Sequence, residues 1–141
     1  MRRRTGTAGS TLVEGSVSLL AFLVVIIGIL DIGQVLFFHH FLNDRVRVGA
    51  RYAVVHAYEP SVIQNVVAYN STEAPMGGAG LFGLKPAMIQ VNHYDAGTPN
   101  ERVKVSVTGY KMHFLSPWLA ASFTPGPFNS VMPVESSGNA P

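Results

Sequence analysis

The longest apolar stretch of the chain lies near its N-terminus and has no polar face. Residues 15–38 contain one charged side chain, Asp31, and their apolar side chains would point in every direction around a helix. As a helix these residues rise about 36 Å, enough to cross a hydrocarbon layer of about 30 Å. The stretch ends at Gln34 to His40 without a small-x-small cleavage site, so a secretory signal is not favoured. The pattern predicts a membrane-spanning helix.

The helical pattern continues beyond the apolar stretch. No proline precedes Pro60, so we expect one helix over residues 10–58. Small and apolar residues recur at helical spacing on one face, which permits close backbone approach. They are Leu42, Val46, Gly49, Ala50, Ala53 and Ala57. Two interpretations stay open. This face packs on the chain's own domain, or it packs against sister subunits, in which case the first five are subunit-packing residues.

Residues 59–141 predict a small α+β domain. Pro60 suits a first helical turn, and the spacing of apolar residues predicts a short helix over 60–70. Alternating apolar and polar residues predict three strands, over residues 87–94, 102–114 and 128–135. The alternation changes phase at Gly109, which is typical of a β-bulge. We therefore expect a small antiparallel sheet that lies with one face against the long helix.

Two carboxylates interrupt the apolar stretch. Asp31 would lie near its far end, where a charge is less costly than at the middle of a bilayer. It is either an acid that reaches the membrane interface or a polar contact between helices of an assembly. Glu14 lies at the start of the stretch, five positions after Gly9 and behind the basic residues Arg2, Arg3 and Arg4.

Composition limits the class of partner. The chain has 141 residues, of which 13% are charged, and its formal net charge is +2. Removing residues 1–9 removes three arginines and no acid, so the balance becomes 7 basic minus 8 acidic residues, or −1. No basic face remains for nucleic acid. The absence of cysteine excludes disulfides and thiolate metal sites.

No catalytic or cofactor motif stands out, and we expect neither an enzyme nor a cofactor-binding protein. His39 and His40 are neighbours that would point about 100° apart on a helix, so we interpret them as interfacial side chains. The remaining histidines, His56, His93 and His113, are scattered and predict no metal site.

The glycine-rich residues 75–86 include a Gly-x-Gly-x-x-Gly pattern at Gly78, Gly80 and Gly83. A dinucleotide site needs a strand before this pattern and a helix after it, so we predict a surface loop instead. Trp118 is expected to fill the core, next to a helical turn at 117–120.

The N-terminal motif resembles a known processing signal. Gly9-Ser-Thr-Leu-Val-Glu14, with arginines before it and an apolar span after it, is similar to a class III (prepilin-type) signal. The resemblance implies that a prepilin peptidase cuts between Gly9 and Ser10, so that Glu14 becomes the fifth mature residue. Together with Asp31-Ile-Gly33, the helix at Gly49-Ala-Arg-Tyr-Ala53 and the late valine strand, the chain looks most like the TadE-like minor pseudopilins of tight-adherence (Tad) pilus systems.

This resemblance implies a processed, structural component of a pilus machine. The expected partners are the prepilin peptidase, a major pilin, other minor pseudopilins, an ATPase-driven inner-membrane platform and membrane lipid. The expected parts are a leader at 1–9, a pilin-like helix at 10–58 and a periplasmic domain at 59–141. The helix would pass once through the bacterial inner membrane, with its N-terminus in the cytoplasm and its far domain in the periplasm or in an extracellular pilus.

Two departures narrow the resemblance, and one alternative remains. Gly15 follows Glu14 where major pilins of these systems tend to carry Tyr, and the first mature residue is Ser10 where type II secretion pseudopilins usually present Phe. Both favour the minor branch, and methylation of the Ser10 amine is left open. The alternative is a single-pass anchor that is never cleaved and holds a small periplasmic interaction domain.

Overall fold

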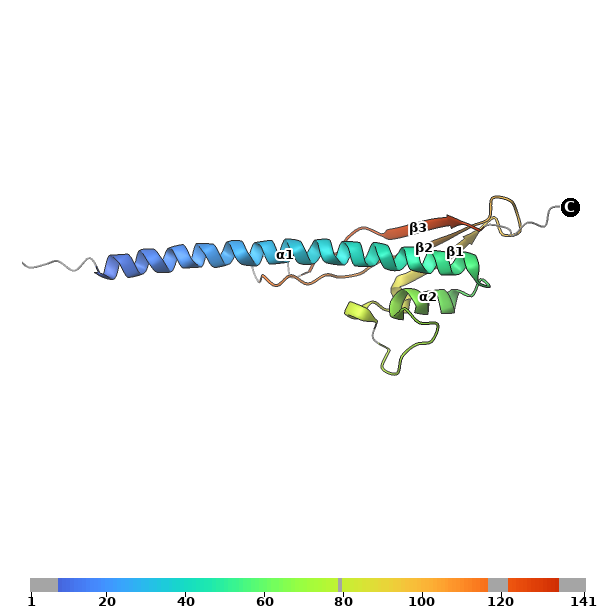
Figure 1. The fold of residues 1–141 in the computed structure, drawn as a ribbon, viewed down its shortest axis with the longest axis horizontal. Coiled ribbons are helices and arrows are strands. Elements are labelled where there is room, and N and C mark those ends of the chain that lie inside the picture. The colour runs from blue at the N-terminus through green and yellow to red at the C-terminus, as the bar shows by residue number, and fades with distance from the viewer. Residues whose placement is uncertain (1–7, 79, 117–121, 135–141) are drawn as a thin grey trace, which may run out of the picture.

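The computed structural model describes residues 8–78, 80–116 and 122–134. The fold is α+β, with one long helix, shorter helices and a three-stranded sheet. Figure 1 shows that the helix extends far beyond the rest of the molecule on its N-terminal side, while the sheet and the second helix gather around its C-terminal half. The predicted fold class is confirmed.

The long helix, α1 (Ala8–Val55), begins two residues before the predicted start and ends three residues before the predicted end. The chain then becomes extended, and Glu59 has φ −133° and ψ 100°, as expected for a residue that precedes proline. The second helix, α2 (Pro60–Tyr69), starts with that proline. It ends at Asn70, whose left-handed backbone (φ 57°) closes the last turn by donating from its N–H to the Val66 carbonyl.

Two short 3₁₀ turns, η1 (Leu81–Gly83) and η2 (Pro86–Met88), lead into the sheet. The strands are β1 (Ile89–Tyr94), β2 (Arg102–Val107) and β3 (Phe128–Pro133), and they are antiparallel in the order β1-β2-β3. The predicted first strand is therefore two residues too long, because residues 87 and 88 belong to η2.

The second strand is shorter than predicted. It ends at Val107, and the pairing with both neighbours is regular, without a bulge. Gly109 (φ 71°) turns the chain out of the sheet, so the phase change in the sequence marks the end of the strand. Tyr110 and Met112 are nevertheless buried, as their spacing predicted, and Met112 pairs with Phe123 through an isolated antiparallel bridge.

The core lies between the sheet, α2 and the second half of α1. Val105 and Val107 of β2 and Ile63 and Val67 of α2 are almost completely buried. Burial of each such side chain contributes roughly 1.5–3 kcal/mol to the hydrophobic driving force. One face of the sheet thus packs on the helices, which anchors the domain to one half of α1. Trp118 and the predicted turn at 117–120 lie outside the described residues.

Candidate functional site

The predicted processing motif lies in the first two turns of α1. Gly9, Ser10 and Glu14 are all exposed, and nothing in the described structure comes within 4 Å of a Cβ built on Gly9. Glu14 makes no hydrogen bond or ion pair with any residue that the structure describes. The motif is therefore accessible, and the Glu14 carboxylate has no hydrogen-bond or ion-pair partner among the described residues.

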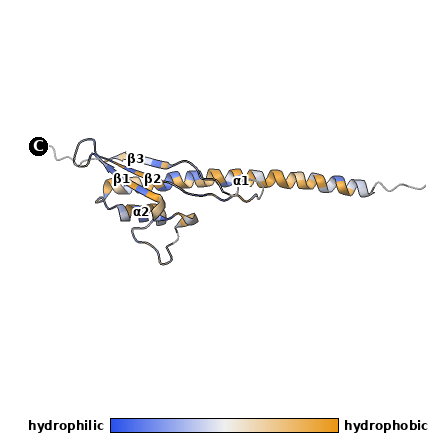
Figure 2. Ribbon diagram, turned by 180° about the vertical axis from the view of Figure 1, so that it is seen from behind, coloured by the Kyte–Doolittle hydropathy of each residue, from blue (hydrophilic) through white to orange (hydrophobic). Residues whose placement is uncertain are grey.

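The first half of α1 exposes apolar side chains on all sides. Within the described residues, α1 alone is long and apolar enough to cross a membrane. In Figure 2 its N-terminal half is coloured mainly as hydrophobic. Only 6% of the most apolar stretch of α1 is buried, so this part of the helix does not belong to the core of the chain. The side chains exposed include Leu12, Val13, Val17, Leu19, Leu20, Phe22, Val25, Ile29 and Leu30. Such a surface needs lipid or other subunits to cover it.

Asp31 is fixed within its own chain. Its side chain is 1% exposed and accepts hydrogen bonds from the backbone N–H groups of Leu115 (2.7 Å) and Ser116 (3.2 Å). Neither interpretation of Asp31 offered by the sequence foresaw this contact. In this conformation each of its two carboxylate oxygens accepts one hydrogen bond from the backbone of residues 115 and 116.

The contact of Asp31 also marks where the distal part of the chain meets α1, inside the predicted span of 15–38. Asp31 is the first α1 residue that is hydrogen-bonded to the distal part of the chain in the described structure, and Gln34 follows it by donating to the His113 carbonyl (3.3 Å). Irregular backbone that faces lipid is not tolerated within hydrocarbon. The part of α1 that precedes these contacts, about residues 11–30, rises about 30 Å.

An aromatic cluster lies against α1 on the C-terminal side of Gln34. The ring of Phe82, in η1, lies edge-on to the rings of Phe37, Phe38 and Phe41, with centroids 5.2–5.5 Å apart. Phe82 has a left-handed backbone (φ 56°), an uncommon conformation for such a bulky residue. Tyr110 donates from its hydroxyl to the Phe82 carbonyl (2.9 Å), and burial raises the pKa of Tyr110. These contacts tie η1 to α1, and no spacing in the sequence predicted them.

The five predicted subunit-packing residues in the second half of α1 are buried in the chain's own core. Leu42, Val46, Ala50 and Ala53 are at most 4% exposed. A Cβ built on Gly49 would collide with the Val67 side chain of α2. In this conformation the face packs on the chain's own domain, which is the first of the two interpretations left open by the sequence. Ala57, placed on the same face by its spacing, lies beyond the end of α1 and is exposed.

The glycine-rich segment is a loop, as predicted. Gly78 and Gly83 have positive φ, and a Cβ on Gly80 would collide with the Leu84 and Ala68 carbonyl oxygens. Helix α2 precedes the loop, the short turn η1 lies within it and η2 follows, so the strand and helix of a dinucleotide site do not flank it.

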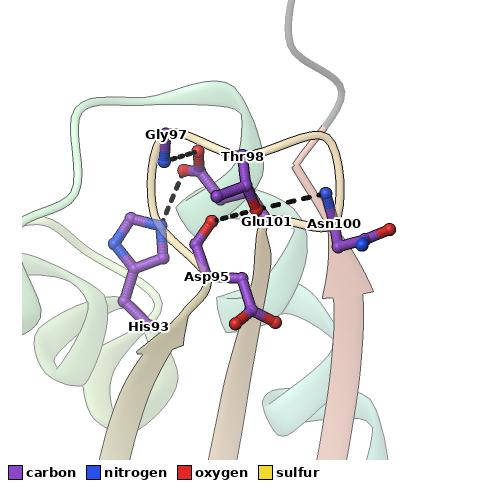
Figure 3. A network of polar contacts seen from close by, with 6 residues as sticks. All are labelled: His93, Asp95, Gly97, Thr98, Asn100 and Glu101. Carbon is purple, nitrogen blue, oxygen red and sulfur yellow. Dashed lines mark hydrogen bonds and ion pairs between the residues drawn. The ribbon is translucent and has the colours of Figure 1, made fainter.

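The far tip of the domain carries a polar network (Figure 3). Glu101 accepts from the Gly97 backbone N–H (2.8 Å) and lies 2.7 Å from Nε2 of His93. The hydrogen bond from Gly97, followed by the one from His93, holds the pKa of Glu101 below its usual value. Thr98 donates to the Asp95 carbonyl (2.7 Å) and completes the turn. These contacts order the loop between β1 and β2.

The described histidines do not converge. His39 packs its ring on Phe128 and His56 stacks on Tyr52, whereas His93 lies at the far tip. Across residues 8–78, 80–116 and 122–134, no three His, Asp or Glu side chains lie close enough to hold a metal ion. The structure therefore offers three sites for consideration: the exposed motif at the start of α1, the apolar half of α1, and the contact at Asp31.

Comparison with models of known protein families, with curated proteins and with solved structures finds no match.

Proposed function

We propose that this chain is a minor pseudopilin of a Tad-type pilus system, cleaved after Gly9 by a prepilin peptidase and acting structurally in pilus assembly. One observation carries the proposal. Gly9 and Glu14 lie exposed at the start of a 48-residue helix whose first half is apolar and uncovered and whose second half holds a folded domain. In such an arrangement the first half is inserted in the inner membrane, with the domain on the periplasmic side.

Cleavage after Gly9 gives Glu14 a chemical partner. Hydrolysis of the Gly9–Ser10 peptide bond leaves an α-amine on Ser10. Ser10 and Glu14 are four residues apart, so both project from the same face of α1. A sister subunit or a major pilin that packs on this face meets one positive and one negative group. An unpaired carboxylate is costly in a low-dielectric bundle, so pairing between subunits favours one register of docking.

The apolar half of α1 supplies the remaining docking surface. Its exposed side chains can face lipid before assembly and neighbouring helices afterwards, because both environments are apolar. The second half of α1 stays packed against its own domain through Leu42, Val46 and Gly49. The subunit contacts that we propose therefore lie between Ser10 and Leu30.

N-terminal sequencing of the chain purified from membranes tests the processing step. With a prepilin peptidase coexpressed, the mature protein should begin at Ser10, and Gly9→Val should abolish cleavage. Gly15→Val is the matched control, because it alters a neighbouring glycine with equally open surroundings and should still be cleaved. A wild-type chain that retains Met1 beside an active peptidase would overturn the proposal and leave the uncleaved single-pass anchor.

Assembly of pili tests the role of Glu14. Glu14→Ala should be cleaved but should reduce pilus assembly or the chain's incorporation, whereas Val13→Ala, at an equally exposed neighbour, should not. Normal pili in the Glu14→Ala strain would show that the proposed pairing with the Ser10 amine is wrong.

A further inference from the structure

The position of Asp31 fixes where the membrane surface meets the molecule. Starting from the charged and polar end of α1 near Ser10, about 30 Å of hydrocarbon is crossed after about 20 residues. The far boundary of the bilayer then falls at Leu30 and Asp31. This step rests on the proposed insertion of the first half of α1.

A segment of the distal domain reaches the same level. After Gly109 the chain leaves the sheet and runs along α1 towards its N-terminal half, and after residue 122 it returns to β3 (Figure 1). Met112 and Phe123 hold the two directions together through two backbone hydrogen bonds of 2.8 Å. Asp31 binds the backbone of Leu115 and Ser116, so Leu115 lies beside the end of the proposed span. We refer to residues 112–116 as the strap.

The strap has an exposed apolar side chain beside the end of the proposed span, and residues 112–116 contain no Asp, Glu, Lys or Arg. Leu115 is 64% exposed, and Phe123, which pairs with Met112, is 43% exposed. By sequence, residues 112–134 contain no Asp, Glu, Lys or Arg. The N–H of Leu115 lies 2.7 Å from Oδ1 of Asp31, and the two neighbours of Asp31 in α1, Leu30 and Ile32, are exposed apolar residues.

The polar groups of the strap suit an interface. Two of its N–H groups, those of Leu115 and Ser116, donate to Asp31, and the His113 carbonyl accepts from Gln34. Pairing these groups lowers the cost of bringing irregular backbone to the edge of the hydrocarbon, where water is scarce. Backbone that is only partly paired would not enter the hydrocarbon itself. The strap is therefore suited to the headgroup region.

We propose that the strap is a second membrane-contact element, which rests in the lipid interface of the periplasmic leaflet with the Leu115 side chain directed into it, and that Asp31 is the positioning residue that holds it there. Lipid is the occupant that the observations favour, because the exposed Leu115 is held at Asp31, next to the exposed Leu30 that ends the proposed span, about one bilayer thickness from the start of that span. A second contact of this kind would set the tilt and rotation of the domain above the membrane before it is drawn into an assembly.

The absence of cysteine from the whole chain allows a direct test. Single-cysteine variants of the full chain would be labelled with the environment-sensitive fluorophore NBD and reconstituted at low protein density in phosphatidylethanolamine/phosphatidylglycerol vesicles. Leu115→Cys reports on the strap. Leu20→Cys, 64% exposed in the middle of the span, is the lipid reference, and Val131→Cys, 51% exposed on β3, is the aqueous reference.

The label at residue 115 should be quenched several-fold less by aqueous iodide than the label at 131, and it should be quenched by spin labels attached near the lipid headgroups. A second change, Asp31→Ala in the Leu115→Cys background, should raise iodide quenching towards that of residue 131. Asp31→Asn, which retains one acceptor oxygen, should lie between the two.

Two outcomes would overturn the inference and leave the proposed anchor intact. In one, residue 20 is shielded by lipid while residue 115 is quenched by iodide as strongly as residue 131. In the other, Leu115→Cys chains cross-link to one another efficiently at low density, which would make a second copy the occupant. If residue 20 were itself open to iodide, the membrane insertion in the proposed function would fail, and this inference would fail with it.

Discussion

The first and second halves of α1 are both rich in apolar and small residues, yet the chain uses them in opposite ways. Below Asp31 the apolar side chains point in all directions and most are exposed, whereas above Phe41 a set of apolar and small residues on one face is buried by α2 and the sheet. Leu20 is 64% exposed and Leu42 is 0% exposed, although they belong to the same helix. The angular spread of the apolar residues, rather than their number, separates the two environments.

The difference also separates two kinds of stability. The second half of α1 is part of the domain core, so its side chains stabilise folding of the chain itself. The first half contributes nothing to that core, and its effects should be felt in insertion and assembly. Asp31 lies at the border, where the last contact of the domain meets the first exposed turn of the apolar half. The predictions that follow test this division.

The largest effect should come from the same substitution made on the two sides of the border. Leu42→Ala removes a fully buried side chain and should lower the free energy of unfolding of the domain by about 2–5 kcal/mol. Leu20→Ala should change it by less than about 0.5 kcal/mol, because its side chain has no core to leave. Chemical unfolding in detergent micelles, followed by near-ultraviolet circular dichroism, measures both. Equal losses would mean that the first half is also part of the folded core.

Glycines offer a second matched pair. Gly49→Leu places a side chain against Val67 and Val105 and should destabilise the domain by about 1–3 kcal/mol. Gly33→Leu meets nothing within 4 Å of its Cβ and should leave domain stability unchanged or slightly higher, because leucine favours a helix more than glycine does. The same unfolding measurement applies. A tolerated Gly49→Leu would show that α2 is not held as closely against α1 as described.

The sequence predicted the elements of the fold well, because each rests on local patterns. The apolar stretch and the absence of proline before Pro60 predicted α1, and Pro60 itself predicted the start of α2. Alternation predicted where β1 and β3 lie, with an error of two residues at the start of β1 and of two residues at the end of β3. The main error was at Gly109, where one phase change fits either a bulge or the end of a strand, and only the pairing of β2 with its neighbours distinguishes them.

The contacts between distant segments were not predictable in this way. Asp31 and Leu115 are separated by 84 positions, and nothing in the spacing around either residue points to the other. The close approach of Gly49 to Val67 has the same origin. A helix face of small residues indicates close packing, but it does not indicate whether the packing partner belongs to the same chain. The exposed, unpaired Glu14 was anticipated only as a motif, and its pairing with a second subunit stays a prediction.

A smaller effect should arise at the contact between η1 and the domain. Tyr110→Phe removes the hydroxyl that donates to the Phe82 carbonyl and should lower domain stability by about 0.5–1.5 kcal/mol. Tyr94→Phe is the control, because the ring of Tyr94 is exposed and no hydrogen bond of its hydroxyl occurs within the described chain. If both variants unfold alike, the η1 contact adds nothing to the upper half, and the aromatic rings alone hold it to α1.

The smallest effect should be the pH dependence of the far tip. The pKa of Glu101 is held below its usual value of 4.5, so the folded state favours the charged carboxylate more than the unfolded state does. Its contribution is therefore fully present above the unfolded pKa and is lost as the pH falls from about 4.5 through the lowered pKa of the folded state. Glu101→Gln should be less stable than wild type at pH 7, and the difference should shrink as the pH is lowered through this range.

The tip also tests whether the two halves of α1 act independently. It lies in water at the end farthest from the proposed membrane, so the pH-dependent difference between wild type and Glu101→Gln should be the same in micelles and in vesicles. Glu73→Gln, at an exposed position in the loop after α2, is the control substitution. Thermal unfolding midpoints between pH 7 and about pH 3.5 measure all three chains. A difference that changed with the lipid around the first half would mean that the membrane environment is transmitted through α1 to the tip, and the division at Asp31 would not hold.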